Sequence, residues 1–170
     1  MPKSIRLTIS TLFGIIIFLS KFLLPTPLDK MLVGIQATLL GLSSLLIGRF
    51  GATYTGLVSG GLLTILRSEF APFSLIFAIA YGLMVDGFFH MFKVRENDDV
   101  KRGRVMIALS LSTVLIGVLS IWVTTIVELV PMIPLLYLTI ILAGVPNGAL
   151  AGYLTALIWK KYLTQATIMK

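Results

Sequence analysis

Two ionisable side chains lie within an apolar stretch of the chain, where charge is costly. Asp86 and His90 are four residues apart in the run of residues 72–92, so they share one face of any helix formed there. A charge at the centre of a bilayer costs about 2.5–3.5 kcal/mol on insertion scales, which makes such a residue a candidate for function. The functional interpretation of the pair is a gate, a coupling element or a ligand contact. We favour the simpler alternative, a polar clamp near the inner membrane surface in which Asp86 pairs with His90 or Arg49.

A second group of side chains has the chemistry to hold a small solute. Trp122, Thr125 and Glu128 are spaced by three residues and fall within one sector of a helix. Further polar or aromatic groups come from other apolar runs, and the predicted substrate-binding set is Gln36, Glu69, Tyr81, Trp122, Glu128 and Asn147. An aromatic surface, two carboxylates and two amides suit a small, planar, nitrogen-rich ligand, including a cationic one.

Several of these residues also have a simpler interpretation. Trp122 would serve equally well as an anchor at the membrane surface, and Glu69 and Glu128 as loop charges in water. Asn147 lies in a glycine-rich run, where an amide can instead hydrogen-bond a neighbouring helix.

The chain carries little that would support catalysis. His90 is its one histidine, cysteine is absent, and no HExxH, GxSxG or GxxxxGK[ST] motif occurs. A site of several histidines, thiolate chemistry and ordinary ATP hydrolysis by this chain are therefore excluded, and we expect no cofactor and no metal. An intramembrane enzyme is the third alternative. It would need Asp86 and His90 to face a wet cavity together with a further polar group.

The elements that position these residues are strongly apolar. Hydrophobic residues make up 57% of the 170-residue chain, charged residues make up 12%, and the mean hydropathy is +1.00. A soluble domain of this size needs more charge on its surface, whereas a bilayer-crossing helix needs roughly 20 apolar residues. We therefore predict an all-α integral membrane protein, a compact bundle of six transmembrane helices forming one domain over residues 1–170. The helices are expected at about 5–24, 28–47, 52–67, 72–92, 105–128 and 133–159.

The predicted breaks coincide with prolines, glycines or clustered charge, which interrupt a helix or leave the membrane. They are Pro25 with Pro27, Gly48–Gly51, Arg67–Pro72, the hydrophilic cytoplasmic loop 93–104 with its eight charged residues, and Glu128–Pro134. The first run has a basic start, as a signal peptide does. Its apolar part is too long and Pro25–Pro27 is not a small-residue cleavage site, so we interpret it as the first membrane helix.

Basic residues divide unevenly between the predicted connections. With the N-terminus inside, the inner side carries eleven Lys and Arg residues and the outer side three, in line with the positive-inside rule. The inner set is Lys3, Arg6, Arg49, Lys93, Arg95, Lys101, Arg102, Arg104, Lys160, Lys161 and Lys170, and the outer set is Lys21, Lys30 and Arg67. We therefore predict a multi-pass protein of the plasma membrane with both termini cytoplasmic. Loop charge also explains the net charge of +7 without nucleic acid as a partner.

Small residues recur at helical spacing and predict where helices approach closely in lipid. They are Gly34, Gly41 and Gly48 in the second run, Gly56 and Gly60 in the third, Ala78 and Gly82 in the fourth, and Gly144, Gly148 and Gly152 in the sixth. Pro146 interrupts the last stripe and is expected to kink that helix or open a cavity.

Three segments resemble a known family of membrane proteins. They are GRFGATYTGLVSGGL (Gly48–Leu62), APFSLIFAIAYGLMVDGFF (Ala71–Phe89) and ILAGVPNGALAGYLTALIWKKYL (Ile141–Leu163). In order and spacing they are similar to the turn into helix three, the fourth helix and the last helix of the substrate-binding S-components of energy-coupling factor (ECF) vitamin transporters. Within that family the chain most resembles the group linked to thiamine or its hydroxymethylpyrimidine precursor, where a carboxylate recurs at the position of Asp86.

The resemblance implies a mechanism and partners. An S-component captures a vitamin near the outer face, joins a membrane T-component and two cytosolic ATPases, and topples in the membrane to deliver the solute inward. In the family the T-component contacts an Ala-xxx-Ala stripe on helix one. The first apolar run here has no alanine, and Ser10-xxx-Gly14 is the nearest substitute for partner docking. The alternative function is a non-transporting structural or assembly membrane protein whose polar residues fix helix packing.

Overall fold

The computed structural model describes residues 3–23, 32–66, 72–96, 99–127 and 134–163, and these are almost entirely helical. The helices are α1 (Lys3–Leu23), α2 (Val33–Ile47), α3 (Gly51–Leu66), α4 (Phe73–Met91), α5 (Arg102–Ile126) and α6 (Pro134–Ile158), the last extended by a π-helical turn, Trp159–Leu163. One helix thus corresponds to each predicted run, although α1, α3 and α5 begin one to three residues earlier than expected. The predicted all-α class is confirmed for this part of the chain.

Four helical segments in the described residues are long and apolar enough to cross a bilayer: Lys3–Leu23, Phe73–Met91, Arg102–Ile126 and Leu138–Leu163. The chain is therefore a membrane protein by helix length and composition. The other two helices are shorter, α2 with 15 residues and α3 with 16. At 1.5 Å per residue they are about 22–24 Å long, less than the roughly 30 Å thickness of a bilayer's hydrocarbon core.

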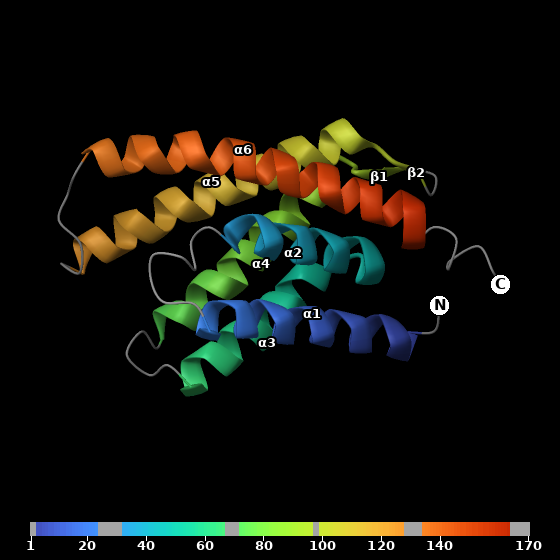
Figure 1. Cartoon of the computed structure of the whole chain (residues 1–170), viewed down its shortest axis with the longest axis horizontal. Coiled ribbons are helices and arrows are strands. Elements are labelled where there is room, and N and C mark those ends of the chain that lie inside the picture. The colour runs from blue at the N-terminus through green and yellow to red at the C-terminus, as the bar shows by residue number, and fades with distance from the viewer. Residues whose placement is uncertain (1–2, 24–31, 67–71, 97–98, 128–133, 164–170) are drawn as a thin grey trace.

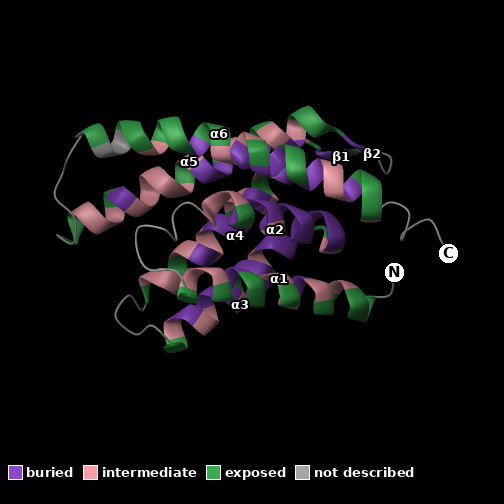
Figure 2. Ribbon diagram, viewed as in Figure 1, coloured by how far each residue is buried: buried purple, intermediate pink, exposed green. Residues whose placement is uncertain are grey.

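Helix α2 is the central helix of the bundle. It contacts all five of the other helices, and α5 and α6 form a pair on one side of it while α1 and α3 lie on the other (Figure 1). Most of its residues are buried, as the purple ribbon in Figure 2 shows. Apolar residues occur on every face of this helix, and in the central position every face can pack against another helix.

The ends of the helices alternate along the bundle. The start of α1, the turn between α2 and α3, the end of α4 and the end of α6 lie at one end, on the right in Figure 1. The end of α1, the end of α5 and the start of α6 lie at the opposite end. We call these the N-terminal end and the far end of the bundle.

The predicted hydrophilic loop 93–104 is shorter in the structure than expected. Its centre forms a two-stranded antiparallel hairpin, β1 (Arg95–Glu96) and β2 (Asp99–Val100), and α5 already begins at Arg102. Val94 precedes β1 and Val100 ends β2, and each is 1% exposed. These two apolar residues insert between the helices, so the segment closes the N-terminal end of the bundle.

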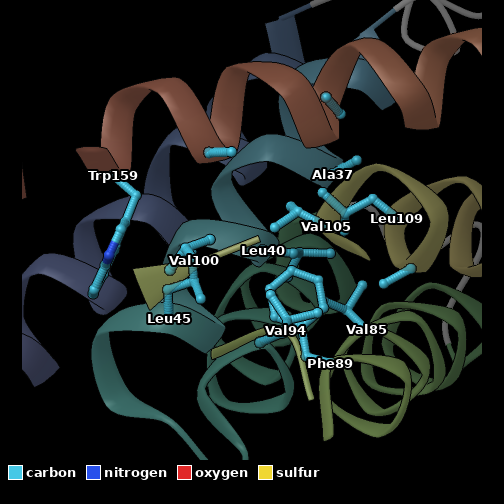
Figure 3. Packing of buried hydrophobic residues seen from close by; sticks show 14 of the residues in the cluster. Ala37, Leu40, Leu45, Val85, Phe89, Val94, Val100, Val105, Leu109 and Trp159 are labelled. Carbon is cyan, nitrogen blue, oxygen red and sulfur yellow. The ribbon is translucent and has the colours of Figure 1, made fainter. Parts of the chain in front are cut away.

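The core gathers around α2. Side chains from α4, α5, the hairpin segment, α6 and its π-helical turn meet those of the central helix in one cluster (Figure 3). It includes Ala37, Leu40, Leu45, Val85, Phe89, Val94, Val100, Val105, Leu109 and Trp159. Lipid is as apolar as these side chains, so close packing rather than exclusion of water holds such a cluster together.

Glycines allow the close helix contacts that the sequence predicts. A Cβ atom at Gly152 on α6 would lie 2.5 Å from the Cα of Met106 on α5, and one at Gly148 would collide with the backbone of Ser110. The α3–α4 contact is similarly tight, because a Cβ at Gly56 would collide with the carbonyl oxygen of Ala78. These helix pairs therefore approach backbone to backbone.

Candidate functional site

Asp86 caps the start of a neighbouring helix. Its Oδ1 accepts a hydrogen bond from the backbone N–H of Ala52 (3.1 Å), and its Oδ2 accepts from the N–H of Thr53 (2.8 Å) and from the Thr53 hydroxyl (2.7 Å). The first N–H groups of α3 have no acceptor within the helix, and they carry partial positive charge. The carboxylate therefore satisfies donors and opposes that charge from α4.

The close approach of α4 to α3 makes this cap possible. A Cβ atom at Gly82, one turn before Asp86, would lie 2.6 Å from both the Ala52 carbonyl oxygen and the Thr53 Cα. Asp86 thus acts as a polar clamp, but its described partners are the first residues of α3 rather than His90 or Arg49. A role of Asp86 and His90 in gating or coupling remains a prediction.

Asp86 and His90 both line a cavity at the N-terminal end of the bundle. It has a volume of about 660 Å³ and lies between the α2–α3 turn and the last turns of α4. Its walls are Ser44, Leu45, Gly48, Arg49, Phe50, Leu83, Asp86, Gly87, Phe89, His90, Lys93, Val94 and Arg95. Asp86 is half-buried and His90 is exposed. The i, i+4 spacing therefore brings both side chains to one wall.

Tyr81 joins two helices in the core. It is 3% exposed, and its hydroxyl lies 2.8 Å from Oγ1 of Thr113 on α5. Thr113 donates its own proton to the carbonyl oxygen of Leu109 (2.7 Å), so Tyr81 is the donor in the Tyr81–Thr113 hydrogen bond. The phenol is thus satisfied within the protein.

Gln36 and Asn147 lie on opposite sides of α2. Gly34 faces Asn147, since a Cβ at Gly34 would be 3.9 Å from both the backbone and the side-chain oxygen of Asn147. Gln36 is two residues further along and therefore about 200° around the helix. It shares its side with Ser43, seven residues on, which contacts α1 and α3. The structure does not bring these two amides together.

Asn147 lies beside the first turn of the central helix. Gly34 is the second residue of α2, whereas Asn147 is in the middle of α6 and half-buried. Leu32, at the position before α2, makes no side-chain cap. The first N–H groups of α2 have no acceptor within their own helix. These donors and the side-chain amide of Asn147 are therefore close together. Pro146 has no N–H, so the carbonyl oxygen of Leu142, one turn earlier in α6, lacks its usual helical donor.

The remaining members of the predicted binding set are at the far end of the bundle or outside the described residues. Trp122 is 54% exposed, as an interfacial anchor would be. Thr125 lies one turn on, and its buried hydroxyl has no hydrogen-bond partner among the described residues. Glu69 and Glu128 fall outside the described residues, so the structure does not place them.

The predicted docking stripe on the first helix faces inward. Ser10 is fully buried, and a Cβ at Gly14 would lie 2.8 Å from the Val58 side chain on α3. A partner subunit would have to displace α3 to contact these two positions. The outer surface of α1 instead carries large apolar residues, among them Leu12, Ile16 and Leu19.

The structure reveals a polar cluster that the sequence pattern does not single out. The hydroxyl oxygen of Ser43 on α2 lies 2.8 Å from Oγ of Ser10 on α1, 2.6 Å from Oγ1 of Thr55 on α3 and 2.8 Å from the carbonyl oxygen of Gly51. All three hydroxyl residues are buried. Serine and threonine residues within apolar runs could have indicated such a cluster. Their spacing along the chain does not reveal which of them contact one another.

Comparison with models of protein families, with curated proteins and with solved structures finds no match to this chain. Among the residues that the structure describes, no three His, Asp or Glu side chains gather in a group that could hold a metal ion.

Proposed function

We propose that this chain is the substrate-capture subunit of an ECF-type importer. It crosses the plasma membrane six times with both termini in the cytoplasm. It binds a small B-vitamin-like solute, such as thiamine or its pyrimidine precursor, toward the outer face. A membrane T-component and cytosolic ATPases then drive delivery to the inside, because the chain has no ATPase motif of its own. The partners and the solute class rest on the sequence resemblance.

The observation that carries the proposal is the contact between Asn147 and the start of α2. A helix that begins at the depth of a neighbour's middle brings N–H groups that have no acceptor within their own helix into the membrane interior. Membrane proteins use helix ends of this kind to hold polar or charged groups of a solute. Here the half-buried amide of Asn147 adds a donor and an acceptor beside Gly34. This gives a solute several polar contacts at one point.

The distribution of charge supports the proposed orientation. Lys3, Arg6, Arg49 and the pair Lys160–Lys161 all lie near helix ends at the N-terminal end of the bundle (Figure 1). Lys21 is in the last turn of α1, toward the far end. By the positive-inside rule, the end of the bundle that carries most of the basic residues is expected on the cytoplasmic side. The solute would then enter from the far end, where α5 ends and α6 begins.

A structural role without a ligand is the second candidate function. It is favoured by the way described polar side chains hold helices together: Asp86 caps α3, Tyr81 bonds Thr113, and Ser43 links three helices. A protein with this role would show no specific solute binding. Substitution of its polar residues would lower stability alone.

The test is equilibrium binding of a panel of B vitamins and their precursors to the purified chain in detergent. We expect one compound to bind, and Asn147→Ala to weaken its binding by about tenfold or more, because an unpaired polar group costs about 1–3 kcal/mol. Thr139→Ala on the same helix is the control. The Thr139 hydroxyl is bonded to the carbonyl oxygen of Leu135 in its own helix, so its loss should leave binding unchanged.

The outcomes separate the two candidate functions. If no compound binds to a chain that still unfolds cooperatively, the structural role is favoured. If a compound binds but Asn147→Ala binds it as tightly as the parent chain does, the solute site is not the one proposed.

A further inference from the structure

The cavity at the N-terminal end of the bundle has the features of a phosphate site. Its lining residues include three permanent cations, Arg49, Lys93 and Arg95, and one acid, Asp86. Both oxygens of Asp86 are already bonded to the start of α3. The carboxylate charge is thus directed at the helix end rather than at the cavity. Guanidinium and ammonium groups are the side chains that bind phosphate oxygens most strongly.

Left-handed backbone geometry occurs at one of the cations, Lys93, and at Phe50, the neighbour of Arg49. Phe50 (φ 69°) and Lys93 (φ 46°) are the two non-glycine residues with left-handed φ among the described residues, and both line this cavity. Such conformations persist where the surroundings fix them, and they cluster at binding sites. At Lys93 the turn directs the chain from the end of α4 into the hairpin, which brings a cation to the rim.

Aromatic rings position the two guanidinium groups. The Cζ of Arg49 lies 5.7 Å from the centre of the Phe50 ring, and the Cζ of Arg95 lies 5.8 Å from that of Trp159. These distances are within the range of cation–π attraction. The contact with the Phe50 ring leaves the edge of the Arg49 guanidinium group, where its N–H donors lie, able to meet an anion.

The same cavity has an apolar wall that faces outward. Phe50 is 54% exposed and Leu83 is 47% exposed, and both line it beside the cations. In a membrane protein, exposed apolar side chains at this position meet lipid chains. A free phosphate would use the cations alone, whereas a phospholipid would use the cations and this wall together.

We propose that this cavity binds the phosphate of an anionic phospholipid headgroup, with the adjoining acyl chain against Phe50 and Leu83. Arg49 and Lys93 are the main phosphate ligands. Basic pockets between helices at a membrane surface bind anionic headgroups in this way. The proposal requires that the chain lies in a membrane, but it does not depend on a transported solute.

The test is binding of soluble short-chain lipids to the purified chain in detergent, measured by calorimetry. The probes are dihexanoyl phosphatidylglycerol, dihexanoyl phosphatidylcholine and glycerol 3-phosphate. We expect phosphatidylglycerol to bind at least about tenfold more tightly than either of the others. We also expect Arg49→Gln to weaken its binding by about tenfold, as the loss of a charged hydrogen bond does.

Two further variants keep the test decisive. Lys93→Gly removes a cation but suits the left-handed backbone, so it should fold at least as well as the parent chain and still lose about tenfold in binding. Arg6→Gln removes the same charge as Arg49→Gln at the same end of the bundle, outside the cavity, and should change binding less than twofold. The proposal is overturned if Arg6→Gln weakens binding as much as Arg49→Gln, or if phosphatidylcholine binds equally well. If glycerol 3-phosphate binds as tightly as phosphatidylglycerol, the cavity binds a phosphate but does not select a lipid.

Discussion

Asp86 on α4 holds Thr53 at the start of α3 by two hydrogen bonds to a single carboxylate oxygen. The backbone N–H and the side-chain hydroxyl of Thr53 lie 2.8 Å and 2.7 Å from Oδ2. A charge that is costly in an apolar helix is thereby placed against the positive end of another helix. The pair connects α4 to the turn that leads out of the central helix, and so it supports one wall of the basic cavity.

Removal of this cap should lower the stability of the bundle. We expect Asp86→Ala to reduce the free energy of unfolding by about 2 kcal/mol, because helix donors lose their acceptor and the helix end loses its counter-charge. Thr53→Ser keeps both donors to Asp86 and should lower the free energy of unfolding far less. Denaturant unfolding of the purified variants in detergent gives both values. An Asp86→Ala protein as stable as the parent would show that the cap contributes nothing.

Adjacent glycines in α3 should differ sharply in their tolerance of a side chain. A Cβ at Gly60 would lie 2.7 Å from the Cβ of Ala78 and 3.1 Å from the Cα of Leu75, whereas a Cβ at Gly61 would meet nothing within 4 Å. Gly60→Ala should therefore destabilise the α3–α4 contact by about 1–3 kcal/mol. Gly61→Ala should be neutral or gain up to about 1 kcal/mol from helix propensity. Thermal unfolding of the two variants side by side tests this, and equal effects would contradict the α3–α4 packing described.

The buried hydroxyl cluster should contribute more than a hydroxyl bonded within its own helix. Ser43→Ala leaves Ser10 and Thr55 without a shared partner, and we expect a loss of about 1–2 kcal/mol. Ser120→Ala is the matched control, because the Ser120 hydroxyl is bonded to the carbonyl oxygen of Gly117 in the same helix. The measurement is the difference in unfolding free energy between the two variants. A larger loss for Ser120→Ala would refute the importance of the cluster.

The helices could be predicted because their causes are local in the sequence. Apolar length makes a helix in lipid, and proline or clustered charge ends it, so the run before Pro25 and the run after Pro72 are visible by inspection. The hairpin was harder to predict. Val94 and Val100 are single apolar residues among charges, and their burial depends on space between helices that the sequence does not display.

The partners of polar residues could not be predicted, because they depend on which helices meet. The sequence indicates Asp86 as a costly charge, but the acceptor role toward Thr53 requires the approach at Gly82. In the same way Ser10 and Gly14 indicate close packing on α1 without indicating that α3 is the helix that packs there. The hydrogen-bond partner of Asp86 and the packing partner of Ser10 and Gly14 therefore follow from how the described helices pack, not from residue type.

The central claim is that α2 and α3 cross the membrane, so that the turn between them is on the cytoplasmic side. The chain contains no cysteine, so a single introduced cysteine reports its own location. We predict that Arg49→Cys in the α2–α3 turn is protected from a membrane-impermeant maleimide in intact cells and labelled after permeabilisation, as Lys101→Cys should be. Lys30→Cys and Ser68→Cys should label in intact cells. Labelling of Arg49→Cys in intact cells, together with Lys30→Cys, would place both ends of α2 outside and contradict six crossings.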